Sequence, residues 1–266
     1  MNNYTIGIVG YGHVGRAMHK LFDEWVKAIY DPFVEIPDGV GKSQVLVNAC
    51  DLAIVCVMTK ENGDGSCDLS IVEETIKWLQ APVILIKSAV VPGTADHLKQ
   101  LTGKRIVVSP EYFGEWKYFM PEEWREPRAL PFQIFGGDPK DTAYCVEVFK
   151  PLFSPRTTYM QVDAKTAELT KYMENIWGAM KVTWANEFYE IAQAMGIDFN
   201  VLRECWALDP RVDKMHTAVY PKDRGFGGKC FPKDLRALIN ASRKAGYEPE
   251  LLVEIDKSNQ RFRKKN

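Results

Sequence analysis

The stretch that decides the fold is IGIVGYGHVG, residues 6–15, close to the amino terminus. Its first four residues are apolar or small and predict a buried strand, and a GxGxxG pattern then opens a helix. In such a pattern the first glycine makes a tight turn, the second lets the backbone approach a ligand, and the third lets helix and strand pack closely. The expected ligand contacts come from Gly10, Gly12, His13, Val14 and Gly15. The spacing alone is also compatible with an ordinary glycine-rich turn.

A carboxylate follows the second expected strand, which runs from residue 27 to residue 30. Asp31 lies about 20 residues beyond the glycines, where an acidic side chain hydrogen-bonds the ribose 2'-hydroxyl of a bound dinucleotide. Because a carboxylate there repels the 2'-phosphate of NADP, we expect NAD as the cofactor. Asp31 also precedes Pro32, and a turn-forming Asp-Pro pair is the simpler alternative.

The first half of the chain alternates short β-branched runs with helical stretches. Runs that predict strands cover residues 4–9, 27–30, 52–57, 83–86, 105–109 and 132–135. This alternation is typical of an α/β fold, here a Rossmann-type parallel sheet. From about Asp163 one helical pattern continues to about Met195. We therefore expect an NAD-binding domain over residues 1–160 and an all-helical domain for dimerisation and catalysis over residues 161–266, with a long central helix.

The long helix carries apolar residues three, four or seven positions apart. They are Leu169, Met173, Ile176, Met180, Trp184 and Ile191. Such a stripe is a core face or an interface, and its extent predicts a symmetric homodimer. The opposite face carries Lys171 and Asn175, four residues apart, together with Gly178. A solvated face is the default reading for such a pair, but a mid-helix glycine costs about 1 kcal/mol relative to alanine and indicates the close approach of another group.

The most informative motif is GFGGKCFPKD, residues 225–234. Pro232 suits the first turn of a helix, which places Cys230 just before a helix amino terminus. The helix dipole there, with Lys229 and Lys233 beside it, favours the thiolate, so we expect the pKa of this thiol below the usual value of about 8.5. A cysteine taken at random is more often a small buried apolar residue. Asp234, four residues on, would share its helical side or simply stabilise the first turn.

Composition and charge exclude several classes of protein. The chain has 266 residues, 46% of them hydrophobic, and a formal net charge of −1, which predicts a globular protein without a footprint for nucleic acid or an anionic membrane. We see no signal peptide and no apolar run long enough to span a bilayer. The six cysteines form no CxxC pair and the four histidines show no metal spacing, so we expect no metal site and a reducing, cytoplasmic location.

Taken together, these segments resemble the UDP-glucose and GDP-mannose dehydrogenase family along nearly the whole chain. The resemblance is carried by the glycine loop and by residues 55–65, 87–94, 109–115, 208–211 and 225–234, the last being highly specific. It implies that Thr59 and Ser88 also line the cofactor site.

The resemblance further implies two successive oxidations of a nucleotide-sugar alcohol to a carboxylate, using two NAD. Cys230 would attack the aldehyde and form a thiohemiacetal and then a thioester, which water hydrolyses. Lys171 and Asn175 match the pair that stabilises developing oxyanion charge. Asp234 matches a carboxylate that positions water or tunes the lysine. Two loop carboxylates, Glu111 and Glu115, complete the set, the second as a base for hydrolysis.

Some departures from the family pattern keep alternatives open. Ala89 stands where the family has a threonine, and Met58 and Lys60 replace prolines. The family continues into a third, nucleotide-binding domain, so we expect a short form that binds NAD but handles UDP-sugars poorly. The alternatives are another NAD-dependent dehydrogenase of hydroxyacids or sugars and a non-catalytic NAD-binding relative. The retained side chains argue against the latter, and a simple dehydrogenase needs no nucleophilic cysteine.

Overall fold

The computed structural model describes residues 4–112 and 126–264. The chain forms two compact units: Met1–Lys60 with Asp68–Lys171, and Glu61–Cys67 with Tyr172–Asn266. One helix, α6 (Ala164–Ala194), contributes residues to both. This division into units does not test the domain boundary expected after residue 160, which stays a prediction.

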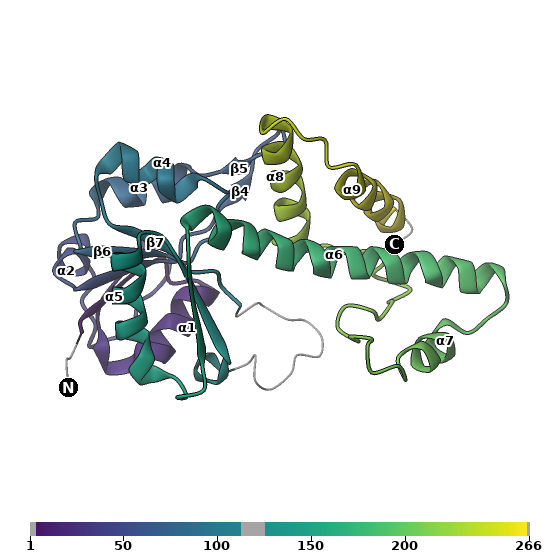
Figure 1. Ribbon diagram of the computed structural model, residues 1–266, viewed down its shortest axis with the longest axis horizontal. Helices are drawn as coiled ribbons and strands as arrows, with labels where there is room; N and C mark the ends of the chain where they lie inside the picture. The colour runs from purple at the N-terminus through teal and green to yellow at the C-terminus, as the bar shows by residue number, and fades with distance from the viewer. Residues whose placement is uncertain (1–3, 113–125, 265–266) are drawn as a thin grey trace. The chain divides into compact units, whose positions relative to one another are not determined.

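The first unit is built on a seven-stranded sheet in the order β2-β1-β3-β6-β7-β8-β9. Figure 1 labels β6 and β7 within this unit. The strands are β1 (Ile6–Val9), β2 (Val26–Tyr30), β3 (Leu52–Val55), β6 (Val83–Ile86), β7 (Ile106–Val108), β8 (Phe132–Gly136) and β9 (Thr158–Val162). All neighbours pair in parallel except β7 and β8. The predicted α/β fold with a largely parallel sheet is confirmed.

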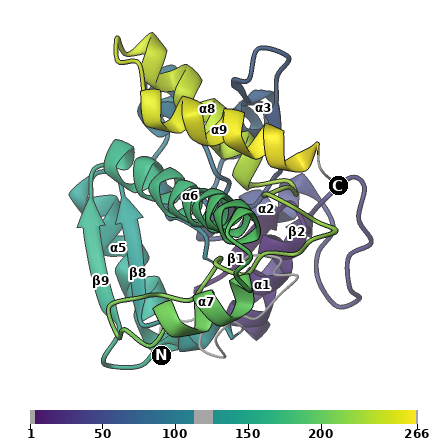
Figure 2. The same cartoon turned by 90° about the vertical axis from the view of Figure 1, so that its right-hand side faces the viewer.

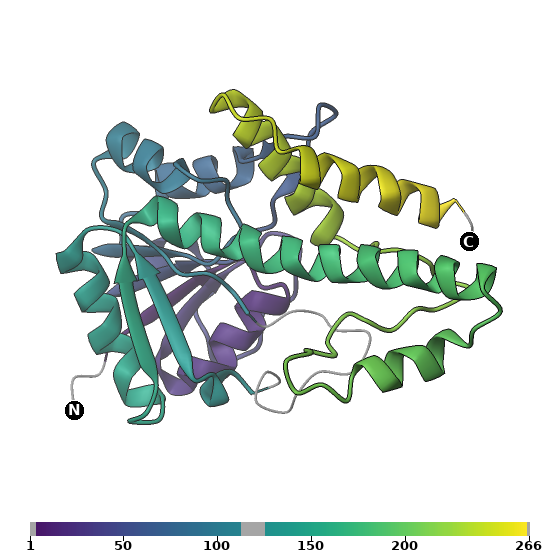
Figure 3. The same cartoon turned by 45° about the vertical axis from the view of Figure 1, so that its right-hand side comes forward.

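One strand of the seven-stranded sheet, β9, was not predicted from the sequence, and neither were the two short strands β4 (Lys60–Glu61) and β5 (Cys67–Asp68). Strand β9 lies at the sheet edge and pairs in parallel with β8, beside which it runs in Figure 3. Its residues are exposed or half-buried, and none is fully buried. An edge strand of this kind carries no continuous apolar run, which is the signal by which the buried parallel strands are found.

Helices cover both faces of the sheet. They are α1 (His13–Phe22), α2 (Gln44–Asn48), α3 (Ser70–Trp78), α4 (Thr94–Thr102) and α5 (Pro139–Phe149), with 3-10 turns at Asp23–Trp25, Pro127–Ala129 and Lys150–Leu152. Side chains alternate between the faces, so Ile54 joins one apolar cluster and Val55 the other. Both clusters are closed to water, which explains the apolar runs of the central strands.

The second unit is mainly helical. Besides its part of α6 it contains α7 (Phe199–Trp206), α8 (Phe231–Lys244) and α9 (Glu250–Arg263), the last two lying side by side in Figure 2. A hairpin of β4 (Lys60–Glu61) and β5 (Cys67–Asp68) is tied to them, because Arg236 of α8 binds Glu61 at 3.0 Å and Asp256 at 3.3 Å. Among the described residues, no helix combines the length and apolar character needed to span a bilayer.

The apolar stripe of α6 differs in part from the predicted one. Met173 is 73% exposed, but Ile176 is only 7% exposed and belongs to the buried face. The large apolar side chains that α6 does expose are Leu169, Met173, Trp177, Trp184, Phe188 and Ile191. The default reading of the opposite face as solvated is wrong, since Asn175 and Gly178 are buried there. Periodicity revealed that two faces exist, whereas packing decides which of them is covered.

Candidate active site

The glycine loop has the strand-turn-helix geometry that its pattern predicts. Helix α1 begins at His13, and Gly10 adopts a φ of 89° in the left-handed region. A Cβ on Gly10 would lie 2.7 Å from the Cys56 carbonyl oxygen, and one on Gly15 would lie 2.0 Å from the Gly10 carbonyl oxygen. A Cβ on Gly12 would meet no heavy atom within 4 Å. Two glycines are therefore required by packing, while the middle one leaves the helix amino terminus open.

Asp31, directly after β2, is anchored to the glycine loop. One of its carboxylate oxygens accepts the backbone N–H of Tyr11 at 2.7 Å, and the other accepts that of Phe33 at 2.8 Å. The turn that Asp31-Pro32 predicts is thus formed. The same carboxylate holds strand end and glycine loop together at the carboxyl edge of the sheet, where α/β proteins bind ligands.

Two hydroxyls join the loops after β3 and β6. The Ser88 hydroxyl donates to the Val57 carbonyl at 2.6 Å, and the Thr59 hydroxyl donates to the Ala89 carbonyl at 3.0 Å. These bonds hold the two loops beside the carboxyl ends of neighbouring strands, since β3 and β6 pair directly. Thr59 and Ser88 therefore shape this edge of the sheet through the backbone.

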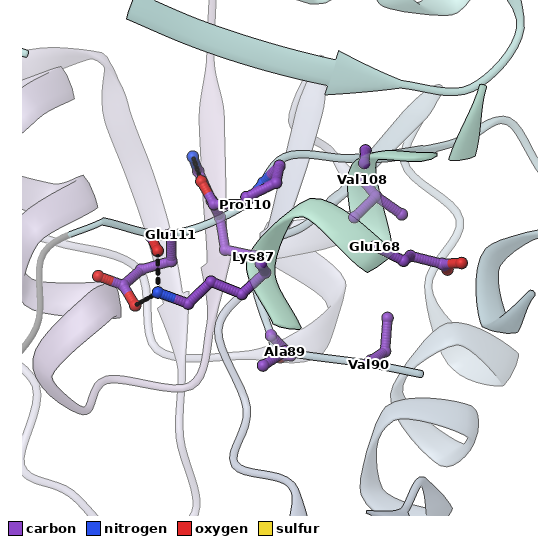
Figure 4. Close-up of a pocket in the computed structure, with 10 residues that line it drawn as sticks. Lys87, Ala89, Val90, Val108, Pro110, Glu111 and Glu168 are labelled. Carbon is purple, nitrogen blue, oxygen red and sulfur yellow. Dashed lines mark hydrogen bonds and ion pairs between the residues drawn. The ribbon is translucent and has the colours of Figure 1, made fainter. Parts of the chain in front are cut away.

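A small cavity of the first unit collects four charged side chains. It is lined by residues after β6, residues after β7 and the first turns of α6, including Lys87, Glu111, Glu168 and Lys171 (Figure 4). The Lys171 ammonium donates to the backbone carbonyl of Glu111 and lies 3.7 Å from its Oε2. The other oxygen of Glu111, Oε1, is buried and has no hydrogen-bond partner among the described residues. A buried acceptor left in this way is suited to a donor on a ligand.

Two groups in this cavity have pKa values moved towards neutrality. Burial lowers the pKa of Lys87 to about 8, and this ammonium donates to the Ser109 hydroxyl at 2.9 Å. Burial raises the pKa of Glu168 to about 7, although its oxygens accept the N–H groups of Gly93 and Ala95 at 2.5 and 2.8 Å. Such perturbed groups gather at functional sites. Glu168 was missed by sequence reasoning, although it stands three residues before Lys171 on the same helical side.

In the second unit, Cys230 occupies the position expected of it. It is exposed and forms the N-cap of α8, with Pro232 in the first turn. The Asp234 N–H donates to the Cys230 carbonyl at 2.9 Å, which closes the first helical turn. The sulfur therefore lies at the positive end of a helix dipole.

Asp234 does more than stabilise that turn. Its side chain is 1% exposed and accepts from the Asn175 amide at 2.6 Å and from the Lys233 ammonium. Gly178, one turn further along α6, is approached closely as predicted, because a Cβ there would lie 2.6 Å from Cζ of Phe231. The motif around Cys230 is thus seated on α6 by one polar and one aromatic contact.

The predicted catalytic residues divide between the units. Lys171 and Glu111 belong to the first, whereas Asn175, Cys230 and Asp234 belong to the second. Lys171 and Asn175 lie one turn apart on α6. Glu115 lies outside the described residues. Within the described ranges, no group of three or more His, Cys, Asp or Glu side chains could hold a metal ion.

Comparison with known proteins places these residues in context. Residues 165–261 match the model of the UDP-glucose/GDP-mannose dehydrogenase family, central domain. The UDP-glucose 6-dehydrogenase of Rhizobium meliloti (strain 1021) is 28% identical over 210 residues, covering 74% of this chain and 47% of the relative. The GDP-mannose 6-dehydrogenase of Pseudomonas aeruginosa is 28% identical over 229 residues, covering 79% of this chain and 50% of the relative. The chain spans about half the length of these curated relatives.

The fold is shared with solved structures as well. That of a UDP-glucose dehydrogenase from the hyperthermophilic archaeon Pyrobaculum islandicum has a TM-score of 0.80 at 23% identity, covering 97% of this chain and 68% of that one. At this identity the likeness concerns the fold alone. Residues 165–261 are thus similar to the central domain of the UDP-glucose/GDP-mannose dehydrogenase family, and the chain shares its fold with a solved UDP-glucose dehydrogenase.

Proposed function

We propose that this protein is an NAD-dependent dehydrogenase that oxidises the primary alcohol of a nucleotide sugar to a carboxylate. The observation that carries the proposal is the thiol of Cys230 at the N-cap of α8, beside the buried bond between Asn175 and Asp234. All three residues lie inside the segment that matches the family's central domain. A simple alcohol dehydrogenase has no need of a nucleophile placed in this way.

The glycine loop fits the dinucleotide that this chemistry requires. Gly10, Gly12, His13, Val14 and Gly15 would hold the pyrophosphate at the amino terminus of α1, where Gly12 leaves the backbone accessible. Asp31 would receive the ribose hydroxyl, and the loops of Thr59 and Ser88 would lie beside the nicotinamide half. When bound, NAD supplies the acceptor for the hydride that leaves in each of the two oxidations.

The residues of the second oxidation act on the aldehyde formed by the first. The Cys230 sulfur forms a bond to the aldehyde carbon, and the carbonyl oxygen takes up the electron pair and a proton, giving a thiohemiacetal. Lys171 and Asn175 stabilise the negative charge that develops on this oxygen, an ammonium and an amide being suited to that task in a dry site. Loss of hydride and a proton leaves a thioester on Cys230.

Water completes the cycle. It adds to the thioester carbon, the carbon–sulfur bond breaks, and the acid leaves while Cys230 recovers its proton. Asp234 helps to position this water or tunes the neighbouring lysine, and of the two loop carboxylates, Glu111 and Glu115, the second supplies the base. Ala89, which lines the cavity beside Lys87, offers no hydroxyl for holding this water.

The same proposal includes assembly and location. The apolar side chains exposed along α6 form a surface too large to leave in water, so we propose a homodimer built on this helix. Met173→Lys should shift the protein towards monomers in analytical ultracentrifugation, whereas Leu251→Lys, at an exposed apolar position on α9, should not. Because the cysteines lack the spacing of a disulfide framework, we place the protein in the reducing cytoplasm.

Counting NADH per molecule of acid tests the function. Wild-type protein with UDP-glucose, GDP-mannose and related sugars should form two NADH per sugar, and Cys230→Ala should form no acid. Acid production by Cys230→Ala at the wild-type rate would refute the covalent mechanism. NAD binding without turnover of any sugar would favour the non-catalytic alternative.

A further inference from the structure

The loop that leads to Cys230 is held by a buried amide of the last helix. Asn259, on α9, is 3% exposed. Its Oδ1 accepts the backbone N–H of Phe226 at 2.7 Å, and its Nδ2 donates to the carbonyl of the same residue at 2.9 Å. One side chain thus satisfies both backbone groups of one loop residue, which leaves that residue little freedom.

The glycine before Phe226 makes this contact possible. Gly225 adopts a φ of 71°, and a Cβ there would lie 2.5 Å from Oδ1 of Asn259. One turn further along α9, Arg263 donates to the Asp223 carboxylate at 2.7 Å and to the Arg224 carbonyl at 3.3 Å. Helix α9 therefore supports the start of the loop with two residues four positions apart.

Helix α6 holds the same point from another side. The Asn186 Oδ1 accepts from the Arg224 guanidinium at 2.6 Å and from the Gly225 N–H at 3.3 Å. Arg224 is buried, pairs with Glu190 at 2.7 Å and lies over the ring of Tyr189 at 4.3 Å. A buried arginine that is paired and hydrogen-bonded in this way is a rigid part of the structure.

Cys230 consequently lies in a short span, residues 226–231, that is held at both ends. Phe226 is clamped by Asn259, and Phe231, which follows the cysteine, packs against Phe226 at 6.2 Å between ring centroids and against His216 at 5.3 Å. Between them lie two glycines and Lys229, which are exposed. Glycines give this span no stiffness of its own, so its ends decide where the sulfur stands.

We propose that Asn259 is a positioning residue for Cys230: by fixing Phe226, it keeps the thiol at the amino terminus of α8 in the orientation that reacts. This inference rests on the proposed function, in which Cys230 is the nucleophile. Removing the amide frees one end of the span, and the sulfur then leaves the helix terminus for part of the time. Its alkylation rate and the second oxidation should both fall.

The test compares Asn259→Ala with a matched control, Asn48→Ala. Asn48 makes the same kind of clamp in the first unit, accepting the Gln80 N–H at 2.7 Å and donating to the Trp78 carbonyl at 3.3 Å. Its clamp lies near the amino ends of the strands, on the edge opposite the glycine loop. Both variants lose two hydrogen bonds, but those of Asn259 are buried and those of Asn48 are partly exposed, so the unfolding free energy should fall by about 1–3 kcal/mol in Asn259→Ala and by less in Asn48→Ala.

The deciding measurement is the iodoacetamide alkylation rate of Cys230 divided by that of Cys205, the exposed thiol on α7, followed by mass spectrometry. Asn259→Ala should lower this ratio by about threefold or more, and Asn48→Ala should leave it unchanged. Asn259→Ala should also reduce kcat for acid formation while leaving KM for NAD unaltered. Should Asn259→Ala not fold, Asn259→Asp keeps the size and the acceptor but exchanges the amide donor for a charged carboxylate oxygen that repels the Phe226 carbonyl, and it should lower the ratio as well.

An unchanged ratio in a folded Asn259 variant, or an equal fall in Asn48→Ala, overturns the inference. The alkylation ratio is measured without cofactor or sugar, so it is independent of the proposed reaction. A failure of the proposed function would be recognised by a different result: wild-type protein would make no acid, or Cys230→Ala would still make it.

Discussion

The sharpest test of the packing around the cysteine is Gly178→Ala. Gly178 lies in the interior of α6, where alanine is normally the better residue by about 1 kcal/mol. The new methyl group would lie 2.6 Å from Cζ and 3.1 Å from Cε2 of Phe231, and 3.3 Å from Cδ2 of His216. Carbon atoms in good contact are about 3.5–4.0 Å apart, so the Phe231 ring would have to move by roughly 1 Å.

Two opposing effects then decide the sign. Helix propensity favours the variant by about 1 kcal/mol, while forcing an extra methyl into a packed interior costs about 1–3 kcal/mol. Phe231 cannot yield easily, because it directly follows the N-cap of α8 and also packs against Phe226. The cost therefore lies towards the upper end of this range, and we expect the variant to be less stable by about 1–2 kcal/mol, which corresponds to a melting temperature lower by about 2–8 °C.

Thermal and urea unfolding of four proteins provide the assay: wild type, Gly178→Ala, Phe231→Leu and the double variant. Leucine is smaller than the ring, so in the Phe231→Leu background the added methyl should be neutral or stabilising. A rise in melting temperature for Gly178→Ala alone would refute the close approach. Equal effects of the methyl in both backgrounds would show that Phe231 is not the group it meets.

Three further outcomes follow from charge and burial. Burial raises the pKa of Glu168 from 4.5 to about 7, so the contribution of this carboxyl to stability is complete below pH 4.5 and is lost as the pH rises through 7. The free energy of unfolding, measured with urea across this range, should therefore fall by about 3 kcal/mol in the wild type, and Glu168→Gln should abolish this fall. Burial raises the pKa of Cys56 and Cys145 to about 12, so in alkylation at neutral pH Cys230 should react well before either. Calorimetry should show tighter binding of NAD than of NADP, and Asp31→Ala should narrow the difference; equal affinities in the wild type would contradict the assignment.

What local sequence could predict was everything that depends on a short, regular pattern. The apolar runs of β1, β3 and β6 are continuous because these strands are buried on both faces, and each was found within two residues of its observed bounds. The GxGxxG spacing and Pro232 are local signals of helix starts, and α1 and α8 begin beside them. The 31 residues of α6 follow from their periodicity alone.

Tertiary structure alone decided which faces are covered and which polar groups meet. The face of Asn175 became interior because Asp234, 59 residues away, supplies a partner for its amide. Asn259 stands in a strongly charged helix, and no local pattern indicates that it reaches a loop 33 residues earlier in the chain. Glu168 similarly looks like an ordinary helical glutamate until the N–H groups of Gly93 and Ala95 meet it. Secondary structure depends largely on neighbours in sequence. The free energy of burying a polar group, in contrast, depends on hydrogen-bond partners that only folding brings near.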